Sequence, residues 1–381
     1  MPAQVDVIKD GFSRGLSKID FDEEVSLIDR RNRMTLYIGV DIHPHQQTVA
    51  WCDKSTGEIR TEDIKHDLEA VRSFYSTLPE PAVIGIEATS KMVWFENMLF
   101  ETGHKLFVGN PVLIRKRATS RHKNDRRDAE LILDLLMKDE FPLIWRRTQE
   151  SNEVIDILGL RRSLVQQRTQ CYNRLQALAH SIGMPKGQMK SKWIQSIIKA
   201  AEMDEASSIR RRLLFTEIEL LNEQIEELQS WLEKKAESDS KVQLLMTQKG
   251  VGPLTALVTV HSLGDVTRFQ KVSKMVASFS GLDPVERSSA GRVRFGGITK
   301  AGSSLLRHHL GQAAMVAVRF DGRLKSFHKR LSKRKPKAVA KTAASRKLLV
   351  KLAIMLRDNI SADEFDRRGR TGNARFEKGL K

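Results

Sequence analysis

The chain has 381 residues, more than one hydrophobic core usually fills, so we expect two compact domains and a connecting element. Its 65 lysines and arginines exceed its 47 acidic residues, and the formal charge of +18 makes nucleic acid the expected partner. The charge by itself is also compatible with a protein that binds anionic lipid, or with a basic protein that has no such partner. With only two cysteines, Cys52 and Cys171, no disulfide framework or cysteine-based zinc site is indicated.

The sequence offers no signal for a membrane or for secretion. No stretch approaches the roughly 18 apolar residues that a membrane-spanning helix needs, and the first thirty-odd residues mix acids with bases. Residues 1–34 are polar and show no strong hydrophobic periodicity. We interpret them as an extension that becomes ordered only when it binds a partner. We therefore expect a soluble cytoplasmic protein.

Residues 35–145 have the pattern of an α/β domain. Three β-rich runs, LYIGVDI, TVAWCD and GEIRTEDI, predict a three-strand meander, followed by a helix from about Leu68 to Leu78. The strand AVIGIEA, the helix VWFENMLFETG, the strand KLFVGN and the helix DRRDAELILDLLMKD come next. Strands that alternate with helices after a meander favour an α/β sheet.

Residues 146–243 are predicted to form a helical, coiled-coil connector. Apolar residues recur there at spacings that alternate between four and three. They are Leu214, Ile218, Leu221, Ile225, Leu228 and Leu232. Such a seam suits either a coiled coil between two subunits or an antiparallel helix pair within one subunit.

Residues 244–358 are predicted to form a mainly α-helical domain with Gly-rich turns, and residues 359–381 a tail. Near its start, LLMTQKGVGPLTALVTV joins two predicted helices through Gly250 and Gly252, as in a helix-hairpin-helix motif. Small glycines in such a hairpin let backbone NH groups approach a phosphate, although the same turn is also a common structural connection.

Four acidic residues stand where the predicted elements can bring them together. Asp41 follows the strand LYIGV and Glu87 the strand AVIGI, whereas Asp125 and Asp128 lie three apart on one helix face. Four converging carboxylates repel one another and need cations, and hard oxygen ligands suit Mg²⁺ or Mn²⁺. Taken alone, Asp125 and Asp128 are also typical of solvated helix charges.

The motifs GVDIH, GIEATS and RHKNDRRDAELI resemble the DEDD pattern of the insertion sequence 110 family of transposases, whose relatives include the Piv-type DNA invertases. The resemblance covers roughly residues 35–145. It implies a RuvC-like, RNase H-type fold in which Asp41, Glu87, Asp125 and Asp128 are catalytic and bind a divalent metal.

The segment GLDPVERSSAGRVRFGGITKAGSSLLR resembles the characteristic block of the same family's C-terminal transposase domain. Its matching positions are Gly281, Leu282, Pro284, Ser288, Ser289, Gly296, Ile298, Lys300 and Gly302. The resemblance implies Ser289 as the nucleophile, but Ala290 replaces the usual glycine and leaves Ser288 as a rival. A serine needs a base or a metal field to act as a nucleophile, and a serine pair is also typical of a polar turn.

Basic residues follow the two serines. Arg292, Arg294, Lys300 and Arg307 are predicted to neutralise phosphate charge, although a solvated basic face would look the same. The later run HKRLSKRKPKAVAKTAASRK is the densest positive stretch and indicates a non-specific nucleic-acid contact.

Two histidine pairs offer weaker signals. His43 and His45 flank Pro44, which argues for a strand end, so we expect a structural or supporting role rather than a metal pair. His308 and His309 are adjacent and point in different directions on a helix, so phosphate or packing contacts are expected of them.

These observations favour a recombinase that cuts and rejoins DNA through the acidic metal site and a covalent phosphoserine at Ser289. By resemblance, its partners are donor and target DNA, a structured guide RNA and further copies of the chain in a dimer or tetramer. The alternatives are an RNA-independent invertase or junction-resolving nuclease, and a non-catalytic nucleic-acid-binding protein. The expected location is the cytoplasm of a bacterium or archaeon, in association with the nucleoid.

Overall fold

The computed structural model describes residues 36–371, except 54–55, 66, 79–80, 89–92, 119–123, 185–186, 188 and 287–293. The chain divides between Arg146 and Arg147 into two compact units, an N-terminal and a C-terminal one. Each unit has its own core, and each is described by itself below.

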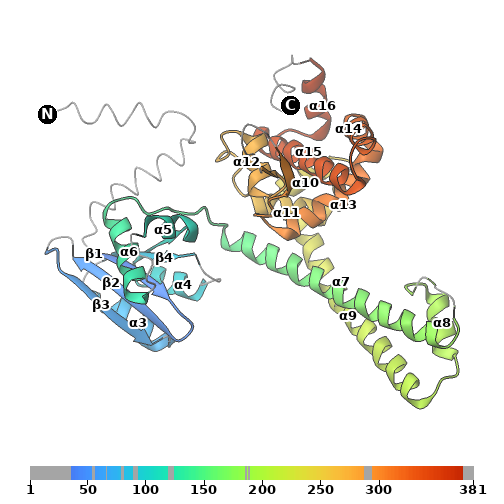
Figure 1. The fold of residues 1–381 in the computed structure, drawn as a ribbon, viewed down its shortest axis with the longest axis horizontal. Coiled ribbons are helices and arrows are strands. Elements are labelled where there is room, and N and C mark those ends of the chain that lie inside the picture. The colour runs from blue at the N-terminus through green and yellow to red at the C-terminus, as the bar shows by residue number, and fades with distance from the viewer. Residues whose placement is uncertain are drawn as a thin grey trace. The chain divides into compact units, whose positions relative to one another are not determined.

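A five-stranded mixed sheet forms the centre of the N-terminal unit (Figure 1). Its strands lie in the order β3-β2-β1-β4-β5. They are β1 (Leu36–Ile42), β2 (Gln46–Asp53), β3 (Ile59–Lys65), β4 (Ala82–Glu87) and β5 (Lys105–Gly109). The first three strands form the expected antiparallel meander, and β4 and β5 continue the sheet parallel to β1. This mixed α/β arrangement is consistent with the expected RuvC-like domain.

Helices cover both faces of the sheet because the strand residues alternate in direction. Even-numbered residues of β1 and β4 pack in one cluster with the buried side chains of α3 (Leu68–Ser76) and α4 (Val93–Glu101). Odd-numbered residues, such as Tyr37 and Val83, pack in a second cluster with α6 (Asp125–Met137). The alternation therefore assigns each position of β1 and β4 to one helical layer.

The packing of α6 on the sheet depends on two glycines. A Cβ atom at Gly39 would lie 2.5 Å from the backbone nitrogen of Leu133 and would also meet the carbonyl oxygen of Ala129. A Cβ atom at Gly85 would lie 2.7 Å from the side chain of Leu136. Gly39 and Gly85 are register partners on the parallel strands β1 and β4. The missing side chains thus leave a groove that takes the backbone of α6 at Gly39 and the side chain of Leu136 at Gly85.

One helix of this unit is not anticipated by the sequence analysis. Helix α5 (Pro111–Arg117) follows β5 directly, and the side chain of Asn110 accepts hydrogen bonds from the backbone NH groups of Val112 and Leu113. An Asn N-cap before a proline at the first helical position is a typical start signal, which the periodicity of so short a helix does not reinforce.

The C-terminal unit begins with a long helix pair. Helices α7 (Gln149–Ser181) and α9 (Glu205–Ser238) pack against each other along their length, and α8 (Lys192–Ala200) lies between them in sequence. Figure 1 shows the pair in green and yellow. Five of the six heptad residues of α9 are buried, Leu228 being partly exposed. The heptad therefore serves an antiparallel pair within one chain.

The remaining elements of this unit form a mainly helical bundle. They are α10 (Ser240–Met246), α11 (Pro253–Leu263), α12 (Val272–Phe279), β6 (Pro284–Glu286), β7 (Phe295–Ile298), α13 (Ser304–Phe320), α14 (Gly322–Ser332), α15 (Lys337–Asp358) and α16 (Ala362–Thr371). Residues 255–263 of α11 are all buried, so this helix lies at the centre of the core. Helices α13 and α15 pack against it and against each other.

Helix α16 lies in the segment that the sequence analysis assigns to a tail. Lys351 of α15 is only 8% exposed, and its Nζ atom lies 2.9 Å from Asp366 of α16 and 3.3 Å from Asp321. A buried ammonium group requires such partners. The ion pair with Asp366 thus attaches α16 to the core, which helps to explain why a hydrophilic segment folds here.

Within the described part of the chain, no helix combines the length and the apolar character needed to cross a membrane.

The glycine groove predicts a local effect of Gly39→Ala. The added methyl group meets helix backbone rather than a movable side chain, so we expect the variant to lose about 1–3 kcal/mol of stability. Hydrogen exchange should accelerate in the amides of α6. Gly159→Ala is the control, because a Cβ atom there meets nothing within 4 Å, and it should be neutral or stabilise α7 by up to about 1 kcal/mol. Unchanged exchange in α6 of Gly39→Ala would contradict the groove.

A buried histidine of α13 predicts a pH dependence of stability. His309 is 8% exposed, and burial, with the nearby charges of His308, Arg161 and Arg162, lowers its pKa to about 4. As the pH falls from about 6.5, the unfolded chain takes up a proton before the folded chain does. Stability that is fully present above pH ~6.5 is therefore lost progressively toward pH ~4, by up to about 3 kcal/mol. Urea unfolding should show a weaker loss in His309→Gln, and equal losses would refute this assignment.

Candidate functional site

The sheet delivers Asp41 and Glu87 to the same edge. Val40 and Ile86 are register partners on the parallel strands β1 and β4, and Asp41 and Glu87 each come one residue later. Each also lies two residues beyond the glycine, Gly39 or Gly85, that faces α6. By strand alternation, both acids stand on the α6 side of the sheet. This places two of the four predicted acids at neighbouring strand ends.

The N-terminus of α6 supplies the other two predicted acids. The side chain of Asn124 caps the helix by accepting a hydrogen bond from the backbone NH of Arg126, and Asp125 and Asp128 occupy the first turn. Carboxylates are favourable at this end of a helix because the unpaired NH groups carry partial positive charge. The interaction of Asp41 with both residues is electrostatic and repulsive.

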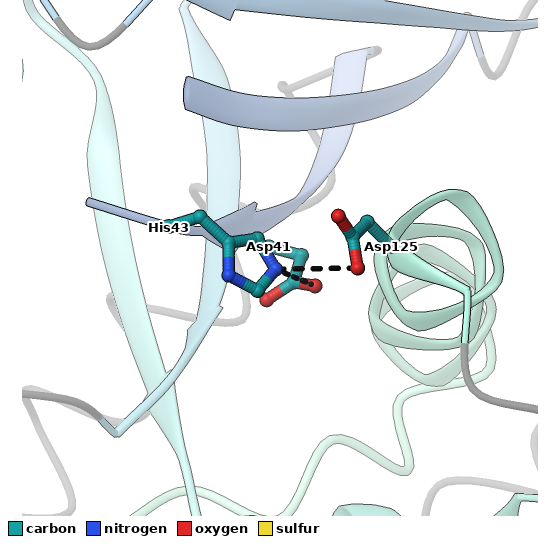
Figure 2. Close-up of side chains that lie close together, drawn as sticks. All are labelled: Asp41, His43 and Asp125. Carbon is teal, nitrogen blue, oxygen red and sulfur yellow. Dashed lines mark hydrogen bonds and ion pairs between the residues drawn. The ribbon is translucent and has the colours of Figure 1, made fainter. Parts of the chain in front are cut away.

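A cluster of Asp41, His43 and Asp125 forms where β1 meets α6 (Figure 2). The Nε2 atom of His43 lies 3.0 Å from Oδ2 of Asp41 and 3.4 Å from Oδ1 of Asp125. One ligand atom from each residue lies within 4.8 Å of the others. Strand β1 ends at Ile42, as expected. His43, for which a structural or supporting role is expected, directly contacts two of the acids.

The charge balance of this cluster is set by burial. Burial raises the pKa of the Asp41 carboxyl, the charge and hydrogen bond of His43 lower it, and the carboxylates of Asp128 and Asp125 raise it again, so that the net effect is a raised pKa. The carboxylate charge of Asp41 is therefore incompletely compensated by the protein. A cation close to Asp41 and Asp125 would be attracted by both.

Glu87 has a different partner in this structure. Its Oε1 atom lies 3.6 Å from Nη2 of Arg115, on α5, and Glu87 is not a member of the three-residue cluster. Arg115 is not among the predicted site residues, because the sequence pattern does not indicate α5. Arg115 is exposed, so its ion pair with Glu87 is weak and can be exchanged for another cation.

The donor set suits a divalent metal ion. Carboxylate oxygens of Asp41 and Asp125 are hard ligands. Asp128 lies in the same helical turn as Asp125, and Glu87 ends the strand next to β1. The His43 imidazole adds a nitrogen atom, a ligand that Mn²⁺ accepts more readily than Mg²⁺ does. The residues present therefore fit a site for a divalent cation, which neutralises the clustered carboxylates.

The serine-containing block of the C-terminal unit is described only at its flanks. Ser288, Ser289 and Arg292 lie outside the described residues. The strands β6 and β7 on either side pair as an antiparallel ribbon. At its base, Thr299 donates a 2.6 Å hydrogen bond from Oγ1 to Oδ1 of Asp283.

Two glycines of this block allow two backbone segments to cross in close contact. Gly281 has a φ of +66°, and a Cβ atom there would lie 2.5 Å from the backbone nitrogen of Ala301. A Cβ atom at Gly302 would meet the backbone of Phe279 and Ser280. The sequence similarity at these positions is thus explained by packing at the base of the ribbon.

Of the predicted phosphate contacts in this block, Arg294 and Lys300 are exposed. Arg307 is engaged by the protein, since its Nη1 atom donates to the carbonyl oxygens of Ser280, at 2.9 Å, and Gly302, at 2.5 Å. These bonds fasten the crossing to α13. Contacts of the three residues with nucleic acid stay predictions.

The turn at Gly250 and Gly252 joins α10 to α11 as expected. Gly250 has a φ of +93°, and its Cα lies against the backbone of Ala317 in α13, so a side chain there would clash. Gly252 is exposed and precedes Pro253, the first residue of α11. Gly250 therefore has a packing role, and phosphate binding by this turn stays a prediction.

Comparison with known proteins connects both halves of the chain to transposases. A family model described as "Transposase", for DEDD transposases of the IS110 type, matches residues 38–184, which include all four acids. A second model, described as "Transposase IS116/IS110/IS902 family", matches residues 242–329, which include the serine-containing block.

Individual relatives carry the same description. A "Probable family 20 transposase" of Pseudomonas aeruginosa is 25% identical over 84% of this chain and 97% of its own length. The transposase of element IS1328 of Yersinia enterocolitica is 28% identical over 64% of this chain and 72% of its own length. That of IS1111A of Coxiella burnetii is 29% identical over 52% of this chain and 56% of its own length. With the acidic cluster on the mixed sheet, these matches show that the chain belongs to the IS110 family and is a DNA transposase with a DEDD-type nuclease domain.

Proposed function

We propose that this transposase cuts and rejoins DNA by combining a metal site at Asp41, Glu87, Asp125 and Asp128 with a nucleophilic serine, Ser289. The observation that supports it best is the grouping of Asp41, His43 and Asp125 at the end of β1, beside the strand that ends in Glu87. Fixed carboxylates at a sheet edge can hold cations against a phosphodiester.

Mg²⁺ is the proposed ion, with Mn²⁺ as a substitute. Carboxylate oxygens are the preferred ligands of Mg²⁺, and four acids provide enough charge for two ions. Such ions, when bound, stabilise negative charge on a phosphate and on the oxygens that attack and leave. The acids would hold the ions in a fixed position at the sheet edge, and Arg115 pairs with Glu87.

The serine step conserves the energy of the DNA backbone. The Oγ atom of Ser289 forms a bond to a DNA phosphorus, the bond from that phosphorus to one sugar oxygen breaks, and the sugar leaves as a hydroxyl. The serine gives up its proton to a base, and the sugar oxygen gains one. Attack of a sugar hydroxyl on the phosphoserine reverses these changes and rejoins DNA without an energy source.

The same proposal includes a structured guide RNA and an assembly of at least two copies of the chain. The formal charge of +18 favours binding of more than one nucleic-acid strand, and a reaction that joins two DNA sites requires that both be held at once. The RNA is implied by the resemblance to the family rather than by any residue of the site.

The metal site predicts a selective loss of ion binding. Asp41→Asn and Asp125→Asn each remove a charged ligand, so Mn²⁺ affinity should fall by about tenfold or more, as measured by the electron paramagnetic resonance signal of free Mn²⁺. Mg²⁺ should displace the bound Mn²⁺. Asp134→Asn is the matched control, because Asp134 lies on the same helix and, among the described residues, forms an ion pair with exposed Lys138 at 2.8 Å. Mn²⁺ affinity in the two site variants equal to that of Asp134→Asn would exclude this site.

The serine step predicts a trapped covalent product. The wild-type protein with Mg²⁺ and its element-end DNA, supplied with any co-purifying RNA, should form a DNA adduct that survives denaturing electrophoresis. Ser289→Ala should abolish the adduct, whereas Ser288→Ala should retain it. The reverse pattern assigns Ser288 as the nucleophile, and an adduct in the double variant would refute the serine mechanism.

The guide RNA is tested by purification from cells that carry the element with its flanking DNA. Sequencing of the bound RNA should give one discrete structured species whose segments match the flanks. Heterogeneous RNA, or DNA joining by the RNA-free protein, would favour an RNA-independent invertase activity on the same acidic fold.

A further inference from the structure

A pocket of about 370 Å³ lies in the C-terminal unit, and none of the residues of the acidic cluster lines it. It is formed by residues of α7, α13 and α15 together with the base of the β6–β7 ribbon. The polar residues that line it and matter here are Arg162, Ser304, Arg307, His308 and Lys341. Its apolar wall includes Leu282 and Ile298, which lie at the two ends of the ribbon base.

The pocket is strongly positive. The charged groups among its lining residues are all basic, since no acid is among them. Burial lowers the pKa of His308, and the charges of Arg162 and Lys341 lower it further, so the fields of both cations reach the pocket. Arg307 adds a fixed charge because its guanidinium is held by the carbonyl groups of Ser280 and Gly302.

Two of the cations of this pocket, Arg162 and Lys341, have no ion-pair partner among the described residues. Lys351, on the same helix as Lys341, pairs with two aspartates. For Arg162 and Lys341, by contrast, the described part of the chain offers no ion pair, and Arg162 makes only a 3.4 Å hydrogen bond from Nη1 to Oγ of Ser304. Two unpaired cations and a hydroxyl thus converge on one cavity.

A second, larger cavity continues the basic surface. It has a volume of about 600 Å³ and lies between α13, α14 and α15. Its cationic lining is Lys329, Lys333, Lys337 and Lys341. Because Lys341 lines both cavities, the basic residues that line them form a series along α14 and α15, which is called the basic track below. A chain of regularly spaced anions would fit such a track better than a single small anion would.

We propose that the pocket at Arg162, Ser304 and Lys341 binds an internucleotide phosphate, with the following phosphates of the same strand along α14 and α15. The arginine provides a planar fork for two phosphate oxygens, and the lysine provides a mobile point charge. Bound there, the strand lies at the base of the ribbon whose connecting segment contains Ser288 and Ser289 in sequence. The inference deepens the proposed function, on which it rests for the nucleic-acid substrate.

Salt-dependent binding tests the pocket. Affinities of the full chain for a fluorescent DNA duplex and for a fluorescent RNA hairpin are measured over a range of KCl concentrations. Arg162→Gln and Lys341→Gln should each bind roughly tenfold more weakly and reduce the slope of log affinity against log salt by about one. Loss on DNA alone, RNA alone or both identifies the source of the phosphate. Arg162→Lys keeps the charge and should retain the slope.

Lys325→Gln provides the matched control, because Lys325 is exposed on α14, lines neither cavity and carries the same charge. If the two pocket variants lose no more affinity than this control, the pocket does not bind phosphate. Neutral methylphosphonates placed at successive positions locate the contact. One position should weaken wild-type binding but not that of Arg162→Gln, and no such position would also overturn the inference.

A failure of the phosphate pocket can be distinguished from a failure of the proposed function. Asp41→Asn should lose DNA cleavage while keeping the salt slope of the wild-type protein, since the acids are not part of the basic track. Wild-type protein that binds through the pocket but never forms a DNA adduct would refute the serine mechanism alone. Adduct formation with unaltered binding by the pocket variants would refute the pocket alone.

Discussion

The contact between α6 and the sheet is the constraint on which the acidic site depends. Gly39 lets the backbone of α6 approach the sheet, and Gly85 on the paired strand leaves room for the side chain of Leu136. The acids Asp41 and Glu87 come two residues after these glycines, and Asp125 and Asp128 lie at the helix end. The packing of α6 on the sheet thus brings Asp41 and Asp125 together, with Glu87 at the end of the neighbouring strand.

Much of this arrangement could be predicted from the sequence because strand alternation and helical spacing are local. The meander, the parallel strands and the positions of Asp41 and Glu87 follow from short apolar runs. The contact of His43 with Asp41 and Asp125 could not, because it depends on how a turn after β1 faces a helix about eighty residues later. The ion pair between Arg115 and Glu87 depends on α5. This helix has one capping signal and is too short to show a periodic pattern of apolar residues.

In the C-terminal unit, three glycines and one arginine of the predicted motifs have structural roles. Gly250, Gly281 and Gly302 each permit backbone segments to touch, and Arg307 bonds the crossing at the ribbon base. A motif match alone does not distinguish such residues from phosphate ligands, because both roles require a small residue or a cation at a fixed position. Burial and hydrogen-bond partners do distinguish them, and they direct attention to Arg162 and Lys341 instead.

The long helix pair has a consequence for distance. Near its start, α7 packs through Val154 and Leu158 in the same core as α11 and α13, and near its end it packs through Cys171 and Leu175 with α8 and α9. From Leu158 to Ser181, the last residue of α7, a helix rises by roughly 35 Å. One turn of B-DNA is about as long. The part of α7 that extends beyond the core is therefore about as long as one helical repeat of B-DNA. If both ends of this part contacted one straight duplex, the two contacts would lie on the same side of that duplex.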